Sequence, residues 1–427
     1  MNSPATSNSL ILEAQADFSL NLLREVSKDG RSCIVSPLSV AIALSMVYAG
    51  AKERTGQEIG QLLAGGALES EVHKYFGDLL TSIKSGHNNY SLELANKVYI
   101  KDGFKVLDAF KAQIMEHYGG QFEAVDFGDK EGTAKKINDF VEEATHGKIY
   151  DLIDPNLLGE MTRLVLINAV YFKGNWANKF NPNLTKKKTF HVDEINTKEL
   201  DMMHKKADFI YFEDEQLQLL GMPYQGGEVF MFVLLPKDRF GLAKLLADLD
   251  GKKLLELTKE RRKSEVQVVL PKFKLESAHE LNQPLANMGM ATAFSDSANF
   301  DGIVTDSLKI SEVVQKAFIE VNEQGTEAAA ATGIHVVANS ANISPNRFIA
   351  DHPFLAFLAI GDDNTNMLFG TNNEAGSEAA AATGLIMVER SLLIIRPPTI
   401  EFIADHPFNF MIVRSEGQLL FSGIFSE

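Results

Sequence analysis

Residues 168–176 read Asn-Ala-Val-Tyr-Phe-Lys-Gly-Asn-Trp, and this stretch decides how the rest of the chain is interpreted. It continues an almost uninterrupted apolar run that begins at Leu164, which is typical of a β-strand buried on both faces. Trp176, the only tryptophan, ends the run as an aromatic anchor. A similar run from Val229 to Leu235 predicts another strand of this kind. The middle of the chain is therefore expected to be rich in strands.

The N-terminal third predicts helices instead. Apolar residues recur at helical spacing between Leu10 and Val26. Ser36-Pro37 then opens a strongly apolar helix from Leu38 to Tyr48, because serine is a favoured cap and proline a favoured first-turn residue. No flexible linker separates this part from the strands that follow. The pattern favours an α+β fold.

Composition narrows the possible partners. The chain has 427 residues and a net charge of −16, which argues against a nucleic-acid partner. Its single cysteine, Cys33, excludes an internal disulfide and a cysteine-rich metal site. No apolar run is long enough to span a bilayer, and residues 1–9 show no secretory signal. Taken literally, these features keep the chain in the cytosol.

The sequence contains no recognisable catalytic motif. A phosphate-binding glycine loop, a Rossmann fingerprint, a Gly-x-Ser-x-Gly elbow and a His-Glu-x-x-His pair are all missing. The ten histidines are scattered singly, without a nucleophile at a recognisable spacing. We therefore expect no enzyme activity, no metal and no cofactor.

The C-terminal part contains a repeat. The sequence NEQGTEAAAATG at 322–333 returns as NEAGSEAAAATG at 373–384, an offset of 51 residues. Further on, FIADHPF occurs at 348–354 and again at 402–408, an offset of 54. Two units are too few for a solenoid array. They are interpreted as two versions of one C-terminal segment in tandem.

The stretch 168–176 resembles the signature on the third strand of the large central sheet of serpins, a family of serine protease inhibitors. Further short motifs follow in serpin order over nearly the whole chain: Ser36-Pro37, Pro223-Tyr224, Leu235-Pro236, Leu270-Pro271-Lys272-Phe273, Ala293-Phe294-Ser295 and His406-Pro407-Phe408. The resemblance implies the α+β serpin fold, with about nine helices around three β-sheets and an exposed reactive-centre loop. It also implies a metastable suicide substrate that acts outside cells.

Residues 320–331 resemble the hinge of inhibitory serpins, which inserts into the central sheet after a protease cuts the loop. In a strand that continues from Gly325, small residues fall on one face, whereas Glu327 falls on the other. This pattern suits insertion between existing strands. The hinge residues of the two copies are Glu323, Gly325, Thr326, Ala328 and Ala330 in the first, and Glu374, Gly376, Ser377 and Ala379 in the second.

The resemblance also assigns residues that control the opening of the sheet. Trp176 is placed at the breach above the inserting strand, and Ser36 and Asn168 in a polar cluster beneath the sheet. Serpins often have a histidine ten residues before the hinge glycine, where this chain has Gln315. Glutamine also donates and accepts hydrogen bonds. We expect retuned opening of the sheet without loss of the mechanism.

Two bonds are candidates for protease attack. Counting from the hinge glycines as in inhibitory serpins reaches Asn339-Ser340 in the first copy and Arg390-Ser391 in the second. An arginine before the bond suits trypsin-like proteases. A shift of one or two residues in the first loop places Ala338 or Val337 there and favours an elastase-like target. The target protease and the functional loop both stay open.

Only one set of closing strands fits in one such fold. The predicted division is a serpin domain with the first loop at 1–371 and a second copy at 372–427, because the first copy needs only local connections. Alternatively, the second copy displaces the first, or the tandem joins two alternative exons by error. We expect a monomer that inhibits a serine protease. The alternative is a non-inhibitory, binding or chaperone-like serpin whose loop the duplication obstructs.

Overall fold

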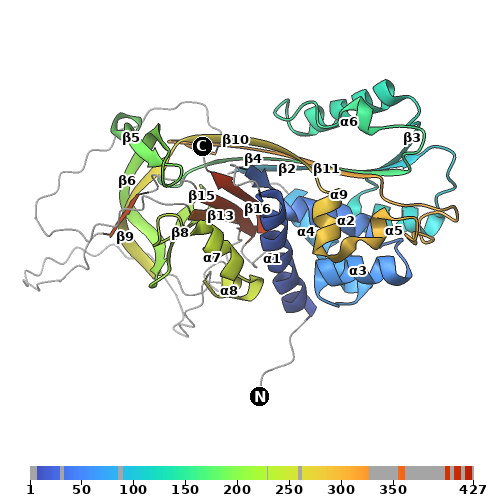
Figure 1. The fold of residues 1–427 in the computed structure, drawn as a ribbon, viewed down its shortest axis with the longest axis horizontal. Coiled ribbons are helices and arrows are strands. Elements are labelled where there is room, and N and C mark those ends of the chain that lie inside the picture. Colours follow the sequence, from blue (N-terminus) through green and yellow to red (C-terminus); the bar gives the residue numbers. More distant parts are fainter. Residues whose placement is uncertain are drawn as a thin grey trace, which may run out of the picture.

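The computed structural model describes residues 7–28, 33–84, 90–227, 229–257, 262–326, 354–360, 400–403, 408–414 and 419–425. A long β-sheet runs along the molecule, with helices gathered at one end and a second sheet at the other (Figure 1). This arrangement confirms the predicted α+β fold.

Most of the helices described belong to the N-terminal third, as predicted. Figure 1 shows α6 alone on one face of the long sheet, while α2, α4 and α9 lie on the other. The α-helices of the described residues are α1 (Ser7–Val26), α2 (Pro37–Tyr48), α3 (Glu53–Ala64), α4 (Glu69–Lys84), α5 (Asp108–Tyr118), α6 (Lys130–Ala144), α7 (Leu242–Asp248), α8 (Gly251–Leu257) and α9 (Asn282–Leu285).

Helix α2 is buried along its whole length, which explains why its sequence is apolar all round. Pro37 occupies its first turn, as predicted. Ser36 is the N-cap residue, but its side chain makes no capping hydrogen bond. Instead, its backbone N–H and C=O bind the side chain of Gln315. The start of α2 is therefore fixed by a distant strand and not by a local cap.

The long sheet has six strands, and strands β11 and β4 run parallel at its centre. Alternate residues of β4 enter two different cores: Leu166 and Val170 face the helices around α2, whereas Ile167 and Ala169 face α6. Burial on both faces confirms the interpretation of this apolar run. The strand order is β10 (Phe273–Glu280), β11 (Glu312–Asn322), β12 (Gly325–Thr326), β4 (Leu164–Asn175), β2 (Tyr90–Lys101) and β3 (Phe122–Val125).

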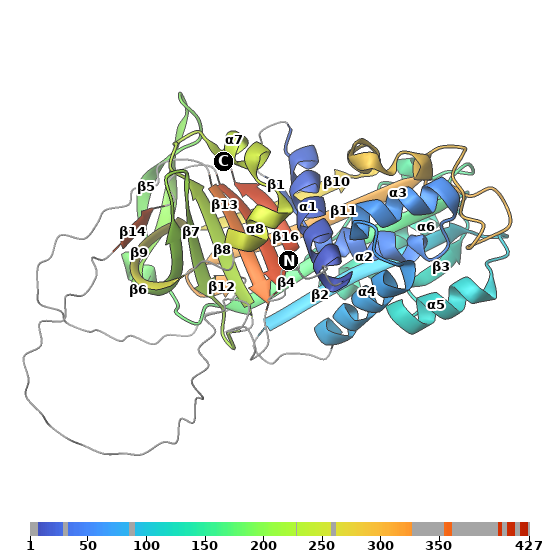
Figure 2. The same cartoon turned by 90° about the horizontal axis from the view of Figure 1, so that it is seen from below.

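The remaining strands form one ten-stranded sheet, in which the long β6 pairs with β5, β7 and β9. Figure 2 shows β6, β7, β8 and β13 side by side in it. Its order is β1 (Cys33–Val35), β16 (Leu419–Phe425), β15 (Phe408–Arg414), β13 (Phe354–Ile360), β8 (Val229–Pro236), β7 (Leu217–Pro223), β6 (Thr197–Glu213), β9 (Arg262–Pro271) and β14 (Ile400–Ile403), with β5 (Lys186–His191) paired to β6.

Both C-terminal copies contribute strands to this sheet. Strand β13 comes from the first copy, and β14, β15 and β16 come from the second. Strand β14 pairs with β9, and β16 pairs with β1 and β15. The division of the chain at residue 371 stays a prediction.

A buried histidine of α4, His73, makes the stability of the folded protein depend on pH in the acid range. His73 of α4 is 1% exposed, and its Nδ1 lies 2.7 Å from the Tyr118 hydroxyl. Its ring stacks on His117, and its Nε2 lies 3.7 Å from the Glu69 carboxylate. Burial, followed by the charges of His117 and Lys52, lowers the pKa of His73 from 6.5 to about 4. The folded protein therefore holds this imidazole neutral.

This lowered pKa predicts a loss of stability in acid. The unfolded chain takes up a proton on His73 near pH 6.5, whereas the folded chain does so only near pH 4, so the stability contributed by neutral His73 is lost as the pH falls through this window. At pH 4.5 the expected loss relative to pH 8 is about 2.5 kcal/mol. We expect His73→Gln to remove this part of the pH dependence in urea unfolding curves. The matched control is the exposed His146→Gln, and equal pH dependence in both variants would contradict the prediction.

Candidate functional site

The six-stranded sheet is closed along most of its length and open at one end. Strands β11 and β4 pair directly up to Phe318 opposite Tyr171. Beyond that point the short β12 lies between them, with Thr326 opposite Val321 of β11 and Gly174 of β4. The first residues after β11 have thus already entered the sheet. Strand β12 pairs with both neighbours, and both pairings are antiparallel.

The entry of β12 depends on a glycine. Gly325 has a φ of 151°, a backbone conformation that side chains disfavour. A Cβ atom at this position would lie only 2.1 Å from the Gly174 carbonyl oxygen. The close approach of the two backbones therefore requires glycine at 325.

Thr326 is fully buried, and its hydroxyl lies 2.6 Å from the hydroxyl of Tyr224. Burial raises the pKa of Tyr224 well above its usual value, so the phenol stays neutral and available for hydrogen bonding. The Tyr224 ring stacks on Trp176 with their centroids 4.3 Å apart. Tyr224, which is itself packed against Trp176, therefore contacts Thr326 and holds it in its buried position.

Trp176 also holds the turn that leads from β11 into β12. Its indole N–H donates to the Asn322 carbonyl at 2.9 Å, and its backbone N–H donates to the Gln324 carbonyl at 2.8 Å. The backbone N–H of Phe180 donates to the Glu323 carbonyl at 2.8 Å. Three successive carbonyls of the turn are therefore bound by one segment, and Trp176 lies beside the end of the sheet where β12 enters.

Glu323 fixes the same turn through its side chain. It is 8% exposed, and its carboxylate accepts hydrogen bonds from Thr185 at 2.8 Å and from Lys272 at 3.0 Å. Burial alone would raise its pKa. Hydrogen bonds from its own backbone N–H, Thr185 and Lys272, together with the charge of Lys272, outweigh burial, and the pKa of Glu323 is lowered. The carboxylate is therefore ionised and paired.

A buried polar cluster ties β11 to β4 farther along the sheet. The Gln315 amide donates to the Ser36 carbonyl at 2.9 Å and also to the Asn168 side-chain oxygen. Its oxygen accepts from the Ser36 backbone N–H at 3.1 Å. Gln315 is fully buried, so it joins β11 to β4 and to the start of α2 in one contact. The structure thus brings Ser36, Asn168 and Gln315 together.

Two members of this cluster were missed in the sequence. The Asn168 amide also donates to Ser39 of α2 at 2.5 Å and to Asn96 of β2 at 2.6 Å. Asn96 lies directly opposite Asn168 in the sheet. Asn96 stands among other polar residues of β2, such as Glu93 and Lys97, and Ser39 is one of two serines of α2, so the local sequence gave no signal for either.

The other predicted site residues lie outside the described part of the chain. This holds for all the scissile-bond candidates and for every hinge residue of the second copy. These residues are Ala328, Ala330, Asn339, Ser340, Glu374, Gly376, Ser377, Ala379, Arg390 and Ser391. They stay predictions.

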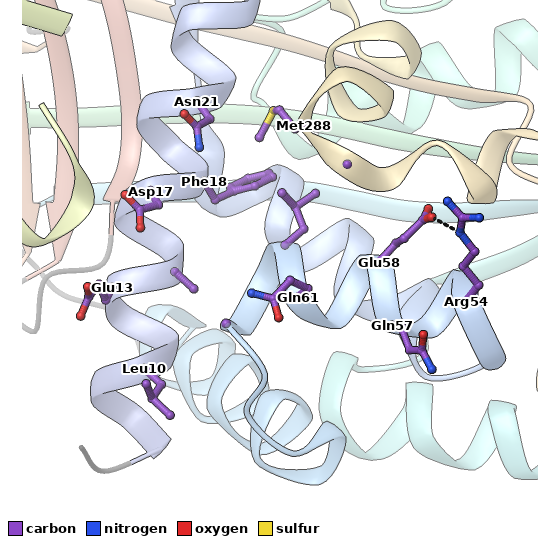
Figure 3. A pocket seen from close by; sticks show the side chains of 14 residues that line it. Leu10, Glu13, Asp17, Phe18, Asn21, Arg54, Gln57, Glu58, Gln61 and Met288 are labelled. Atoms are coloured by element: carbon purple, nitrogen blue, oxygen red, sulfur yellow. Dashed lines mark hydrogen bonds and ion pairs between the residues drawn. The ribbon is translucent and has the colours of Figure 1, made fainter. Parts of the chain in front are cut away.

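A separate cleft of about 750 Å³ lies between α1, α3 and the segment that carries Met288 (Figure 3). Two of its three carboxylates have structural partners. Glu58 binds Arg54 and the Thr292 hydroxyl, and Asp17 accepts from the backbone N–H of Gly251. Glu58 and Asp17 therefore tie neighbouring elements together.

Within the residues described, no group of three or more histidine, cysteine, aspartate or glutamate side chains is arranged to hold a metal ion. No helix among them has the length and apolar character needed to cross a bilayer.

Comparisons with known proteins identify the fold and the family. A sequence profile of the serpin (serine protease inhibitor) family matches residues 13–372 and again residues 371–427. Serpin B6 of Pongo abelii is 37% identical over 370 residues, covering 84% of this chain and 98% of that protein. The leukocyte elastase inhibitor of Bos taurus is 38% identical over 346 residues, covering 78% and 90%.

Among solved structures, Serpin48 of the insect Tenebrio molitor, described as a highly specific serpin, superimposes with a TM-score of 0.77. It is 30% identical and covers 99% of both chains. The chain belongs to the serpin family. Membership supports a protease inhibitor and not an enzyme.

The Gln315 cluster yields a prediction for the closed sheet. Gln315→Ala would remove the hydrogen bonds that Gln315 makes with the Asn168 side-chain oxygen and with the Ser36 backbone N–H, while the Ser36 carbonyl would keep the Val40 N–H. We expect the free energy of unfolding to fall by on the order of 1–3 kcal/mol, the cost of a buried polar group left unsatisfied. Urea unfolding measures this change. Gln283→Ala, at an exposed position on α9, is the control. Unchanged stability and inhibition kinetics in Gln315→Ala would show that the position does not matter.

Proposed function

We propose that this serpin inhibits serine endopeptidases as a suicide substrate, and that the residues after Thr326 insert between β11 and β4 when the loop is cut. The observation that carries the proposal is the position of β12, which already lies between these two strands with Thr326 buried. Insertion then needs only the continuation of two ladders that have begun. Each added residue would gain backbone partners on both edges.

The register of β12 predicts where each inserted residue would go. Continuing both ladders residue by residue places Ala328 opposite Ile319 and Phe172. Ala330 would lie opposite Ala317 and Val170. These four neighbours are buried in the core that faces α2, where only small side chains can be added. The small residues of the hinge would therefore enter the crowded face.

The same register places the one charged residue of the hinge at an accessible position. Glu327 would lie opposite Glu320 and the exposed Lys173, on the face toward α6. Thr332 would lie opposite Gln315 and Asn168, at the polar cluster. Insertion to this depth would break the Gln315–Asn168 hydrogen bond, and the threonine hydroxyl could replace part of it. A full-length insertion would therefore require the hydrogen bond between Gln315 and Asn168 to break first.

The class of target and the extracellular place of action rest on the family resemblance. The hinge of the first copy supports Asn339-Ser340, or a bond one or two residues earlier, as the bait, since that loop follows β12 directly. Arg390-Ser391 of the second copy is the competing bait for a trypsin-like protease. We propose that the inhibitor acts as a monomer.

The first experiment is incubation of the protein with trypsin and with elastase, followed by denaturing electrophoresis and mass spectrometry of the released C-terminal peptide. We expect a complex that survives denaturation, because insertion would trap the acyl-enzyme. A peptide beginning near Ser340 would assign the bait to the first loop, and one beginning at Ser391 would assign it to the second. Cleavage without any complex would contradict inhibition and favour the non-inhibitory serpin.

A hinge variant tests the insertion step. Ala330→Glu would carry a charge into the core beside Ala317 and Val170. We expect the fraction of trapped protease to fall on the order of tenfold or more while the loop is still cut, because burying an unpaired charge costs several kcal/mol. The matched control is Glu327→Ala, which changes a residue on the opposite face of the same hinge. If Ala330→Glu trapped protease as well as the control did, insertion in this register would be wrong.

A further inference from the structure

Strand β8 has a single edge available for the C-terminal part of the chain. Its other edge pairs with β7, from Leu217 opposite Pro236 to Pro223 opposite Phe230. The available edge is approached by strands from both copies, β13 and β15.

Both strands are in register with the same residues of β8. Val233 is opposite Ala356 of β13 and also opposite Phe410 of β15. Phe232 is opposite Phe357 and also opposite Met411. One backbone N–H and one C=O per residue cannot serve two complete ladders on the same edge. The pairing of β15 with β8 is limited to these two residue pairs, whereas β13 pairs with β8 over six. At Phe232 and Val233 the two strands therefore meet the same edge of β8.

The offset between the two strands repeats the offset in the sequence. Phe354 is opposite Phe408, and Ile360 is opposite Arg414, so β13 and β15 are related by 54 residues throughout. The same 54 residues separate the two FIADHPF segments. Equivalent residues of the two copies thus meet at equivalent places, which a chance approach of unrelated strands would not produce.

The strands that flank this edge do not show which copy closes the sheet. The second copy supplies β14 and β16, which pair with β9 and β1. At the same offset of 54, the first copy has the corresponding residues 346–349 and 365–371 in its sequence. The hinge in the six-stranded sheet, β12, belongs to the first copy. The described structure therefore combines the hinge of one copy with closing strands of the other.

We propose that the two C-terminal copies are alternative closing segments that compete for the edge of β8, so that the chain folds into two forms. In the first form β13 fills the position, and β14, β15 and β16 lie outside the sheet. In the second form β15 and β16 fill it, and residues 327–399 connect the hinge to β14.

Chain length does not forbid either form, because the entropic cost of closing a loop grows only with the logarithm of its length. The choice of form would set the length of the connection that carries the bait. In the first form this connection ends before residue 346. In the second form it includes both candidate bonds, Asn339-Ser340 and Arg390-Ser391.

Proline substitutions in the full-length chain test the competition. Leu358 of β13 and Ile412 of β15 are opposite each other and occupy equivalent places in the two copies. Proline removes the backbone donor and is excluded from the interior of a sheet. We expect Leu358→Pro alone and Ile412→Pro alone to fold with cooperative urea transitions, because the other copy takes the position. The double variant should lose the folded state.

Two outcomes of this experiment would overturn the proposal. If either single variant failed to fold, the copies would not be interchangeable. If the double variant folded normally, neither strand would be needed at β8. Leu358→Ala and Ile412→Ala are the controls for side-chain loss, since alanine keeps the backbone donor.

Hydrogen exchange of the unmodified protein gives a second and independent readout. The protected fractions of 354–360 and 408–414 should add up to a single occupancy, with each segment exchanging freely in the molecules where the other is paired. Full protection of both segments would contradict the competition. All these readouts report folding and not inhibition, so failure of this proposal and failure of the proposed function are distinguishable.

Discussion

The parallel contact between β11 and β4 is the constraint on which the rest of the structure depends. These strands pair from Glu312 opposite Val165 to Phe318 opposite Tyr171, at the centre of the sheet. Parallel pairing is slightly weaker per residue than antiparallel pairing, and it leaves no turn between the two strands. An added strand antiparallel to both replaces one ladder by two. The sheet is thus paired across its centre by one parallel ladder, and an inserted antiparallel strand would give it two ladders in place of that one.

The closed state is held by buried polar groups rather than by apolar packing alone. Gln315 crosses from β11 to Asn168 of β4, and Glu323 is paired with Lys272 where β11 turns toward β12. Hydrogen bonds of this kind are directional and lose their value at small displacements. Apolar contacts, by contrast, can be rebuilt against an inserted strand of small residues. Under the proposed insertion mechanism, a sheet that first resists opening and later accepts a strand is therefore better secured by a few polar contacts.

The sequence predicted those parts of the site that depend on local pattern. The apolar run at 164–172 indicated a strand buried on both faces, which the structure confirms. The small residues after Gly325 indicated an inserting hinge; the structure describes the first of them, Thr326, and insertion of the rest stays a prediction. Asn96 and Thr185 were not predicted, because a single polar residue in a strand or turn most often faces solvent. Their role follows from pairings across long separations, such as Asn96 opposite Asn168 and Thr185 with Glu323. Register between distant strands is set by the whole fold and not by neighbouring residues.

The C-terminal repeat is a second case in which local sequence does not determine how distant strands pair. Local pattern identifies both copies equally well, because each carries the motif FIADHPF and the strand that follows it. Only the fold reveals that the two strands meet one edge, since Val233 has a partner in each of them. The pairing of β15 with β13 shows that the sheet itself can hold strands of both copies. What the copies share is the edge of β8 at Phe232 and Val233, and the local sequence does not decide which copy closes the sheet there.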